Sequence, residues 1–488
     1  MVNTVAHLVF IPAPGIGHII SAIEMAKLLV NRDQRFSITV LIIKPPNVSS
    51  VSAMTSYIES LANQNMGPIS FIEVPQDKTP PPLSHSKSPV TFFIEFISGH
   101  CNNVKNVVAD MISQPDFGRF AGFVIDTLCT SMIDVANEFN IPTYVFFTSN
   151  AAFLGFVLYL PTLFDSHDKD VIELSNSDTE IPIPSFVKPV PTKVFPNMFL
   201  TREDVDLLVW SLQKHREVKG IVVNTFFELE THAIKSLSTS IGNPPVYPVG
   251  PILNLEAGGG AAGKSSDNDV IGWLDNQPPS SVVFLCFGSM GFFDEIQVKE
   301  IANALEHSGH HFLWSLRQPP SDQTSKVPTD YEDARMVLPK GFLERTAGIG
   351  RIIGWAPQVM ILAHQAIGGF VSHCGWNSIL ESLWFGVPLA TWPIYAEQQI
   401  NAFEMVAELG LAVEIKLDYK KDLFSLKADS VIVSADEIES GIRRLMEDHE
   451  VRTKVKEMSK KSRTTVAEDG SSYASVGYLI QDLIRNMT

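Results

Sequence analysis

The sequence has few cysteines, no long hydrophobic run and no excess of positive charge. Its four cysteines form no CxxC pair and no Cys/His spacing suited to zinc, which fits a reducing compartment and argues against a disulfide framework. The longest apolar stretch, Ala151 to Leu163, is too short to span a bilayer. The first residues lack a basic region before a short apolar run, so we expect a strand there instead of a signal peptide. These absences predict a cytoplasmic protein without a membrane span.

The charge balance narrows the class of partner. The 54 acidic residues outnumber the 37 Lys and Arg, which gives a net charge of −17. Nucleic acids and anionic membranes are bound through excess positive charge, so neither is expected as a partner. The electrostatic field of a protein with this net charge would not attract an anionic ligand. A phosphate site must therefore be built locally, from backbone N–H groups and a helix N-terminus.

The first half of the chain alternates short apolar runs with helical patterns, which predicts an α/β domain with a mostly parallel sheet. The expected elements are a helix over Gly17–Asn31 and strands over His7–Pro12, Ser37–Ile43, Phe120–Ile125 and Thr143–Phe147. The Pro- and Ser-rich stretches Asn65–Pro89 and Asp165–Pro196 are expected to be loops and short hairpins.

A Gly-rich segment divides the chain. A length of 488 residues already favours two domains or more. We expect an N-terminal domain over 1–250, a linker over 251–270 and a second αβ domain over 271–470, so that two Rossmann-like domains face each other. The second domain is expected to contain the following elements: strands Val282–Phe287, His311–Leu316, Arg351–Gly354, Gly369–Ser372 and Leu389–Trp392, and helices Glu295–His307, Gln358–His364, Asn377–Phe385 and Gln398–Leu409.

The segment from Trp355 to Gln398 is the most informative part of the chain. It gathers four tryptophans, two histidines and the helix start His-Cys-Gly-Trp-Asn-Ser, a composition that suits a ligand site better than a core. Over its whole length it resembles the signature box of plant UDP-sugar-dependent glycosyltransferases. The resemblance implies a GT-B fold, in which a last helix within 471–488 crosses back to the first domain. It also implies a UDP-sugar donor and a small-molecule acceptor.

Glycosyl transfer to a hydroxyl needs a base, and His18 is the candidate. It follows the first strand on the first turn of a helix, at the edge of the sheet where ligands of α/β proteins bind. A helix N-terminus disfavours positive charge, so we expect a neutral imidazole near pH 7. Asp126, at the end of another strand, could stabilise the imidazolium, although it could also cap the helix that begins near Ser131. The resemblance places the family's His/Asp dyad on His18 and Asp126.

The leaving UDP needs hydrogen-bond donors. The strand–Gly375–helix arrangement aims backbone N–H groups at phosphate, and His373, Asn377 and Ser378 can add side-chain donors. Ser289, after a neighbouring strand, supplies another. Glu381 could merely complete a capping box with Ser378, whereas the resemblance assigns its carboxylate to the ribose.

Base and sugar contacts complete the donor site that the resemblance implies. Trp355 offers a face for uracil, although it could instead be a core residue as Trp392 is expected to be, and Gln358 can reach the base or ribose. Sugar hydroxyls are assigned to the following residues: Glu397, Gln398, Trp376 through its backbone, and Thr148. In the family a glutamine at the end of the segment goes with glucose, so Gln398 implies UDP-glucose.

The sequence contains no metal-binding constellation, so we expect neither a metal nor a further cofactor. Helix N-termini and His373 are expected to neutralise the diphosphate. Direct displacement by one acceptor oxygen would invert the anomeric centre and give a β-glucoside of a phenolic, flavonoid or terpenoid. Some phenylalanines could line the acceptor pocket, although most are expected in the core: Phe92, Phe93, Phe96, Phe147, Phe153, Phe156, Phe195 and Phe199. The protein is expected to be a monomer.

Three other functions stay open at this point. The same fold could use another UDP-sugar, or the protein could bind nucleotide sugars without catalysis. The second alternative is disfavoured because binding alone requires neither His18 nor Asp126. The glycines from Gly15 also begin like a dinucleotide fingerprint, but Ile20 occupies the third glycine position, which disfavours a nicotinamide oxidoreductase.

Overall fold

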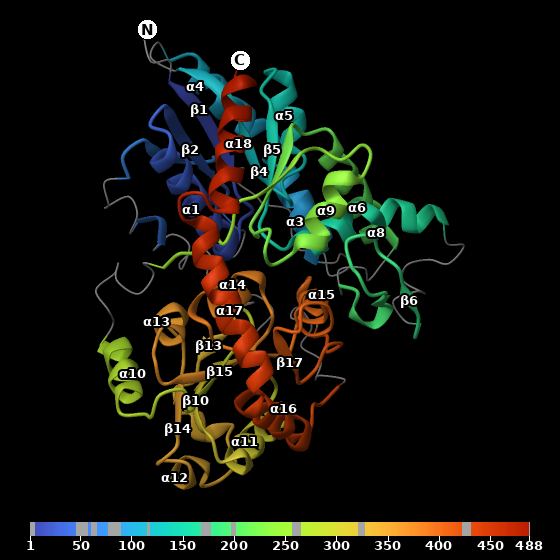
Figure 1. Ribbon diagram of the computed structural model, residues 1–488. Helices are drawn as coiled ribbons and strands as arrows, with labels where there is room; N and C mark the ends of the chain where they lie inside the picture. Colours follow the sequence, from blue (N-terminus) through green and yellow to red (C-terminus); the bar gives the residue numbers. More distant parts are fainter. Residues whose placement is uncertain are drawn as a thin grey trace.

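The computed structural model describes residues 5–44, 57–59, 66–76, 89–114, 118–166, 177–196, 202–255, 265–320, 327–421 and 431–487. Within these residues the chain forms two large parallel sheets, one in each half, with buried side chains on both faces (Figure 1). The architecture is the GT-B arrangement of two Rossmann-like domains, and it confirms the expected fold class.

The N-terminal sheet has the strand order β3-β2-β1-β4-β5-β8-β9, and all its neighbouring pairs are parallel. Its strands are β1 (Ala6–Ile11), β2 (Phe36–Ile42), β3 (Ile69–Glu73), β4 (Arg119–Asp126), β5 (Thr143–Phe147), β8 (Gly220–Val223) and β9 (Val246–Pro248). Because side chains alternate along a strand, Leu8 and Phe10 of β1 enter one core, and Val9 and Ile11 enter the other.

Helices cover both faces of this sheet. The helices of the N-terminal half are α1 (Ile16–Arg32), α3 (Pro89–Ser98), α4 (Cys101–Ile112), α5 (Met132–Glu138), α6 (Ala151–Ser166), α8 (Arg202–Gln213) and α9 (Thr231–Thr239). Residues of α1 fill one core, and residues of α4, α5 and α6 fill the other. A short antiparallel pair, β6 (Glu180–Ile181) with β7 (Val190–Pro191), lies outside the sheet.

The C-terminal sheet has the order β14-β11-β10-β15-β16-β17 and is also parallel throughout. Its strands are β10 (Val282–Cys286), β11 (His311–Ser315), β14 (Gly350–Ile353), β15 (Ile367–Ser372), β16 (Leu389–Thr391) and β17 (Ala412–Glu414), and a small antiparallel pair joins β12 (Arg317–Gln318) to β13 (Thr329–Asp330). Its helices are α10 (Ser265–Asp275), α11 (Glu295–Ser308), α12 (Phe342–Arg345), α13 (Gln358–Leu362), α14 (Trp376–Phe385), α15 (Gln398–Phe403), α16 (Ala435–Glu447) and α17 (His449–Val466).

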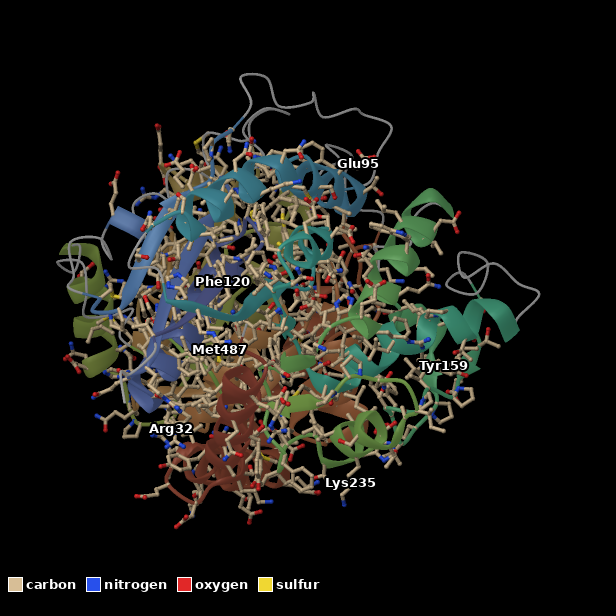
Figure 2. All side chains as sticks on the ribbon, turned by 90° about the horizontal axis from the view of Figure 1, so that it is seen from above. Arg32, Glu95, Phe120, Tyr159, Lys235 and Met487 are labelled. Carbon is tan, nitrogen blue, oxygen red and sulfur yellow. The ribbon has the colours of Figure 1, made fainter. Side chains whose placement is uncertain are left out.

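The last helix, α18 (Ser471–Arg485), leaves the C-terminal half and packs on the N-terminal sheet (Figure 1). Its apolar residues share a core with β1, β2 and α1. Asp482 accepts hydrogen bonds from the hydroxyls of Tyr144, at 3.2 Å, and Tyr247, at 3.1 Å. Seen from above in Figure 2, the chain end at Met487 lies near Phe120 of β4, and the guanidinium of Arg119 donates to the Met487 carbonyl at 3.4 Å.

Three expectations about local structure were wrong. The stretch expected to be loop and hairpin contains the edge strand β3, which is short and only partly buried and so lacks a continuous apolar run. The helix α10 begins inside the expected linker, whose Gly-rich residues 256–264 lie outside the described part of the chain. The helix expected over Gln398–Leu409 is α15 followed by a π-helical turn, Glu404–Glu408, before Gly410 turns the chain with a φ of +62°. The domain boundaries themselves stay a proposal.

A substitution at Leu483 would measure how much the packing of α18 on the N-terminal sheet contributes to stability. Its side chain is fully buried in the core shared with β1. Leu483→Ala should lower the free energy of unfolding by about 2–5 kcal/mol, because truncation loses apolar burial and leaves a cavity. Thermal and denaturant unfolding would measure the loss. Tyr478→Ala on the same helix is the matched control, since Tyr478 is 64% exposed and should change stability by less than about 0.5 kcal/mol.

Candidate functional site

The His18 and Asp126 side chains form a hydrogen-bonded pair. His18 lies in the first turn of α1, and Asp126 is the last residue of β4, so the parallel pairing of β1 and β4 brings them to one edge of the sheet. The distance from His18 Nδ1 to Asp126 Oδ2 is 2.7 Å. The other Asp126 oxygen accepts a hydrogen bond from the Leu128 amide at 3.0 Å and does not cap α5. The Nδ1 proton is thus held by the carboxylate, which leaves Nε2 as the nitrogen that can accept a proton.

Burial and two carboxylates act on the pKa of His18. Burial lowers it, whereas the charge of Asp126, the hydrogen bond to Asp126 and the charge of Glu397 raise it. The result is a pKa above the ordinary histidine value. The helix N-terminus was expected to act against protonation, whereas the observed shift is upward because two carboxylates on other elements outweigh burial.

The segment after β5 connects His18 to the C-terminal half. Thr148 Oγ1 lies 3.3 Å from His18 Nδ1, and Ser149 Oγ lies 3.5 Å from Glu397 Oε1. Burial raises the pKa of Glu397, and the neighbouring His18 opposes that increase. Glu397 directly precedes α15, so this end of α15 lies beside the base.

Gln398 is less available than its sequence position indicated. The side chain is buried, and its Oε1 accepts hydrogen bonds from the backbone amides of Ile394, at 2.9 Å, and Tyr395, at 3.0 Å. The expected contact of Gln398 with a sugar hydroxyl can therefore not use this oxygen, because both of its lone pairs already accept hydrogen bonds. The carbonyl holds the turn before α15, which leaves only the NH₂ group for a ligand.

His373 lies between two glycines at the start of α14. A Cβ at Gly288 would lie 2.5 Å from His373 Nε2, and a Cβ at Gly375 would lie 2.6 Å from it. Neither position can therefore carry a side chain while the ring stays in place. Burial lowers the pKa of His373 to about 4, and no residue in the described part of the chain hydrogen-bonds its Nδ1. The ring of the ligand-free protein is therefore neutral near pH 7 and can donate a hydrogen bond. Its expected role at a diphosphate stays a prediction.

Gln358, Ser378 and Glu381 lie together beside α14. Gln358 Nε2 donates to Ser378 Oγ at 2.9 Å and to Glu381 Oε2 at 2.6 Å. Burial raises the pKa of Glu381 to about 7, and the hydrogen bond from Gln358 opposes this shift. The capping-box alternative for Glu381 is wrong, since the N-cap of α14 is Gly375.

Trp355 and Trp392 have opposite environments. Trp355 is 58% exposed, with the Arg317 guanidinium 5.2 Å from its ring centroid, so the alternative that Trp355 is a core residue is wrong. Trp392 is fully buried among aromatic rings, as expected. Ser289 lies partly buried in the turn after β10.

The side chains of Trp376 and Asn377 extend toward the N-terminal half. The buried Trp376 indole donates to the Asn224 carbonyl at 2.7 Å. Asn377 Nδ2 lies 3.3 Å from Ser21 Oγ of α1. In this arrangement both side chains join the two halves, and Asn377 is not directed only at a phosphate position as the sequence had indicated.

Two buried polar pairs were missed by the sequence analysis. The Asn150 amide donates to Asn401 Oδ1 at 2.8 Å. Glu230 accepts from the backbone amides that begin α6, Ala151 at 3.0 Å and Ala152 at 2.7 Å, and its charge acts on the neighbouring Glu404. Burial and the charge of Glu230 raise the pKa of Glu404 well above its usual range. A single Asn or Glu in a helical pattern carries no signal of a partner distant in sequence, so these pairs could not be found.

Most of the candidate acceptor-pocket aromatics are core residues. The following phenylalanines are at least nine-tenths buried: Phe92, Phe96, Phe147, Phe153, Phe156 and Phe195. Phe93 is half-buried, and Phe199 lies outside the described residues. Several pack ring against ring.

The described residues contain no group of three His, Cys, Asp or Glu side chains placed to hold a metal ion. None of the helices described in this chain combines the length and apolar character needed to cross a membrane.

Comparisons with known proteins identify related sequences and structures. The family model described as UDP-glucoronosyl and UDP-glucosyl transferase matches residues 244–449. UDP-glycosyltransferase 71A15 of Malus domestica is 50% identical over 98% of this chain and 99% of its own length. UDP-glucose flavonoid 3-O-glucosyltransferase 6 of Fragaria ananassa is also 50% identical, over 98% of each chain. The crystal structure of Medicago truncatula UGT71G1 complexed with UDP-glucose superposes with a TM-score of 0.86 at 42% identity and covers 99% of each chain.

Identity at this level is more than a shared fold, because it extends over nearly the whole length of both chains and so includes the N-terminal and the C-terminal half. The chain therefore belongs to the plant UDP-glycosyltransferases.

Proposed function

We propose that this enzyme transfers glucose from UDP-glucose to a hydroxyl of a small lipophilic plant metabolite, with inversion, to give a β-glucoside. The observation that carries the proposal is the 2.7 Å contact between His18 and Asp126, with Glu397 of the other domain close enough to raise the His18 pKa. A dyad of this kind next to a donor-side carboxylate suits proton removal during displacement at a sugar. The names of relatives that act on flavonoids and anthocyanidins support a phenolic acceptor.

In the proposed reaction, Nε2 of His18 takes the proton of the acceptor hydroxyl while the oxygen attacks the anomeric carbon. The bond from that carbon to the UDP oxygen breaks, and UDP leaves with the electron pair. Asp126 stabilises the imidazolium that forms, through the hydrogen bond at Nδ1. One displacement by one oxygen inverts the α-linked donor.

The donor residues keep the roles that the resemblance implies. Trp355, with its exposed face, is proposed to stack on uracil, and Gln358 and Glu381 to bind the ribose side. The N–H groups at the start of α14, with His373, Ser378 and Ser289, are proposed to stabilise the diphosphate without a metal. Glu397, the NH₂ group of Gln398, and Thr148 are proposed to hold the sugar. Because Gln358 already bonds Glu381, the ribose would have to share or replace that hydrogen bond.

A product analysis tests the proposal. The purified enzyme should be incubated with UDP-glucose, UDP-galactose or UDP-glucuronic acid and a panel of flavonoid, simple phenolic and terpenoid alcohols. We expect a monoglucoside with UDP-glucose, a β anomeric coupling by NMR and an unchanged rate with EDTA. An α-glucoside, a strong preference for another UDP-sugar, or UDP binding without turnover on any acceptor would contradict the proposal.

His18→Ala should reduce kcat by about a hundredfold or more, the usual effect of removing a general base. UDP affinity should stay near that of the wild type, because the proposed UDP contacts lie in the other domain. Steady-state kinetics and calorimetric titration with UDP would measure the two quantities. Near-normal turnover on an alcohol acceptor would rule out His18 as the base.

The pH dependence should report the raised pKa of His18. The base must be unprotonated, so kcat/KM should fall as the pH drops through the His18 pKa, and this acid limb should be centred above the ordinary value of about 6.5. Asp126→Asn removes a negative charge that stabilises the imidazolium, so the limb should move to lower pH while the plateau rate falls. An acid limb that stays in place or moves upward in the variant would contradict this assignment.

A further inference from the structure

A chain of two hydrogen bonds crosses between the domains behind the site. Asn150, between β5 and α6, donates through Nδ2 to Asn401 Oδ1 at 2.8 Å. Asn401, on α15, donates through its own Nδ2 to the Cys374 carbonyl at 3.0 Å. Both asparagines are almost completely buried. These two hydrogen bonds therefore join the segment that follows β5 to the loop that follows β15. Both are buried, so water cannot replace either bond.

At the N-terminal end of this pair of hydrogen bonds, Asn150 is linked to the residues around His18. Asn150 Oδ1 accepts from the Phe153 amide at 2.6 Å, which caps the first turn of α6. Glu230 accepts from the two preceding amides of that turn, those of Ala151 and Ala152. Thr148, two residues before Asn150, lies 3.3 Å from His18 Nδ1. The position of Asn150 therefore sets the position of a group that contacts the base.

At the C-terminal end of this pair of hydrogen bonds, Asn401 supports an unusual backbone conformation. Cys374 has a φ of +63°, in the left-handed region that a side chain disfavours, and it needs support from its surroundings. Its amide donates to Ser372 Oγ at 3.2 Å, and Asn401 binds its carbonyl. This conformation turns the chain from β15 into α14, between His373 and the N-terminal amides of the helix. Asn401 thus helps to set the direction of the groups that face the diphosphate.

We propose that Asn401 is a positioning residue for glucosyl transfer, which aligns the donor loop at Cys374 with the His18 side of the site through Asn150. This inference rests on the proposed function of His18. Asn401 itself lies three residues beyond Gln398 and needs no contact with substrate. Its effect is geometric: it holds the anomeric carbon and the activated acceptor oxygen in line, and small misplacements of such groups reduce turnover strongly.

Three single variants separate this role from general contact between the domains. Asn401→Ala removes both bonds of the chain. Asn150→Ser keeps a neutral cap for α6 but is too short to reach Asn401. Glu408→Ala is the matched control, because Glu408 also bonds across the domains, accepting from the amides of Val187 at 2.9 Å and Lys188 at 2.7 Å, and no contact of those residues involves His18 or Cys374.

The measurements are kcat, the Kd for UDP and the melting temperature of each variant, with turnover assayed well below the transition. Asn401→Ala should reduce kcat by about tenfold or more, as expected for sub-ångström to ångström misplacement, and should weaken UDP binding. Asn150→Ser should reduce kcat similarly but leave the UDP Kd within about twofold of wild type, since the bond to Cys374 remains. Glu408→Ala should leave both quantities within about twofold, even where its melting temperature falls.

The double variant Asn150→Ser/Asn401→Ala provides the decisive comparison. Its kcat should be no lower than that of Asn401→Ala, because both changes break the same bond. Multiplied losses, unchanged kcat in both single variants, or an equal loss in Glu408→Ala would overturn the proposal. If Asn401→Ala does not fold, the comparison of Asn150→Ser with Glu408→Ala decides. Full activity of His18→Ala would instead refute the proposed function, whatever the asparagine variants do.

Discussion

Burial of Ile400 and Phe403 in the core of the N-terminal half is the contact on which the site depends. Both residues belong to α15 of the C-terminal half, and both join the apolar cluster formed by α4, α5 and α6. The Phe403 ring also packs 6.0 Å from that of Phe186. Because α15 begins directly after Glu397, this apolar contact fixes the distance between the donor-side carboxylate and His18. The polar bonds across the domains then select one orientation of a contact that apolar burial alone would leave less specific.

Acidic side chains gather where the two halves of the protein meet, although the proposed donor is an anion. Burial raises the pKa of Glu381 and Glu397, the two carboxyl groups proposed to bind the donor, and so favours their neutral forms. His373 is neutral for the same reason. With a net charge of −17, attraction for a nucleotide must come from oriented amides at the start of α14 more than from charged side chains. His18 differs from His373, because two carboxylates raise the pKa of His18 and favour its protonated form.

Much of the fold could be predicted, because strongly periodic segments determine their own secondary structure. The strand over Thr143–Phe147 was placed with its observed bounds, and β1, α1 and α11 within one or two residues. The predictions failed where local pattern is weak or where tertiary contacts decide. The strand β3 is a short edge strand, and the π-helical turn after α15 depends on a backbone bond from Leu409 to Glu404.

For the site, the sequence by itself determined which chemical groups are present and which loops carry them. Strand ends of a parallel sheet share one edge, so His18 and Asp126 could be paired from their positions, and the resemblance of one segment supplied the proposed donor residues. Only the tertiary structure decided which hydrogen bonds those groups make. The Gln398 carbonyl accepts from its own turn, the Trp376 indole donates to Asn224, and Asn401 accepts from a partner 251 residues away. Hydrogen bonds between residues distant in sequence depend on how two independently patterned domains dock, and a local pattern carries no information about that docking.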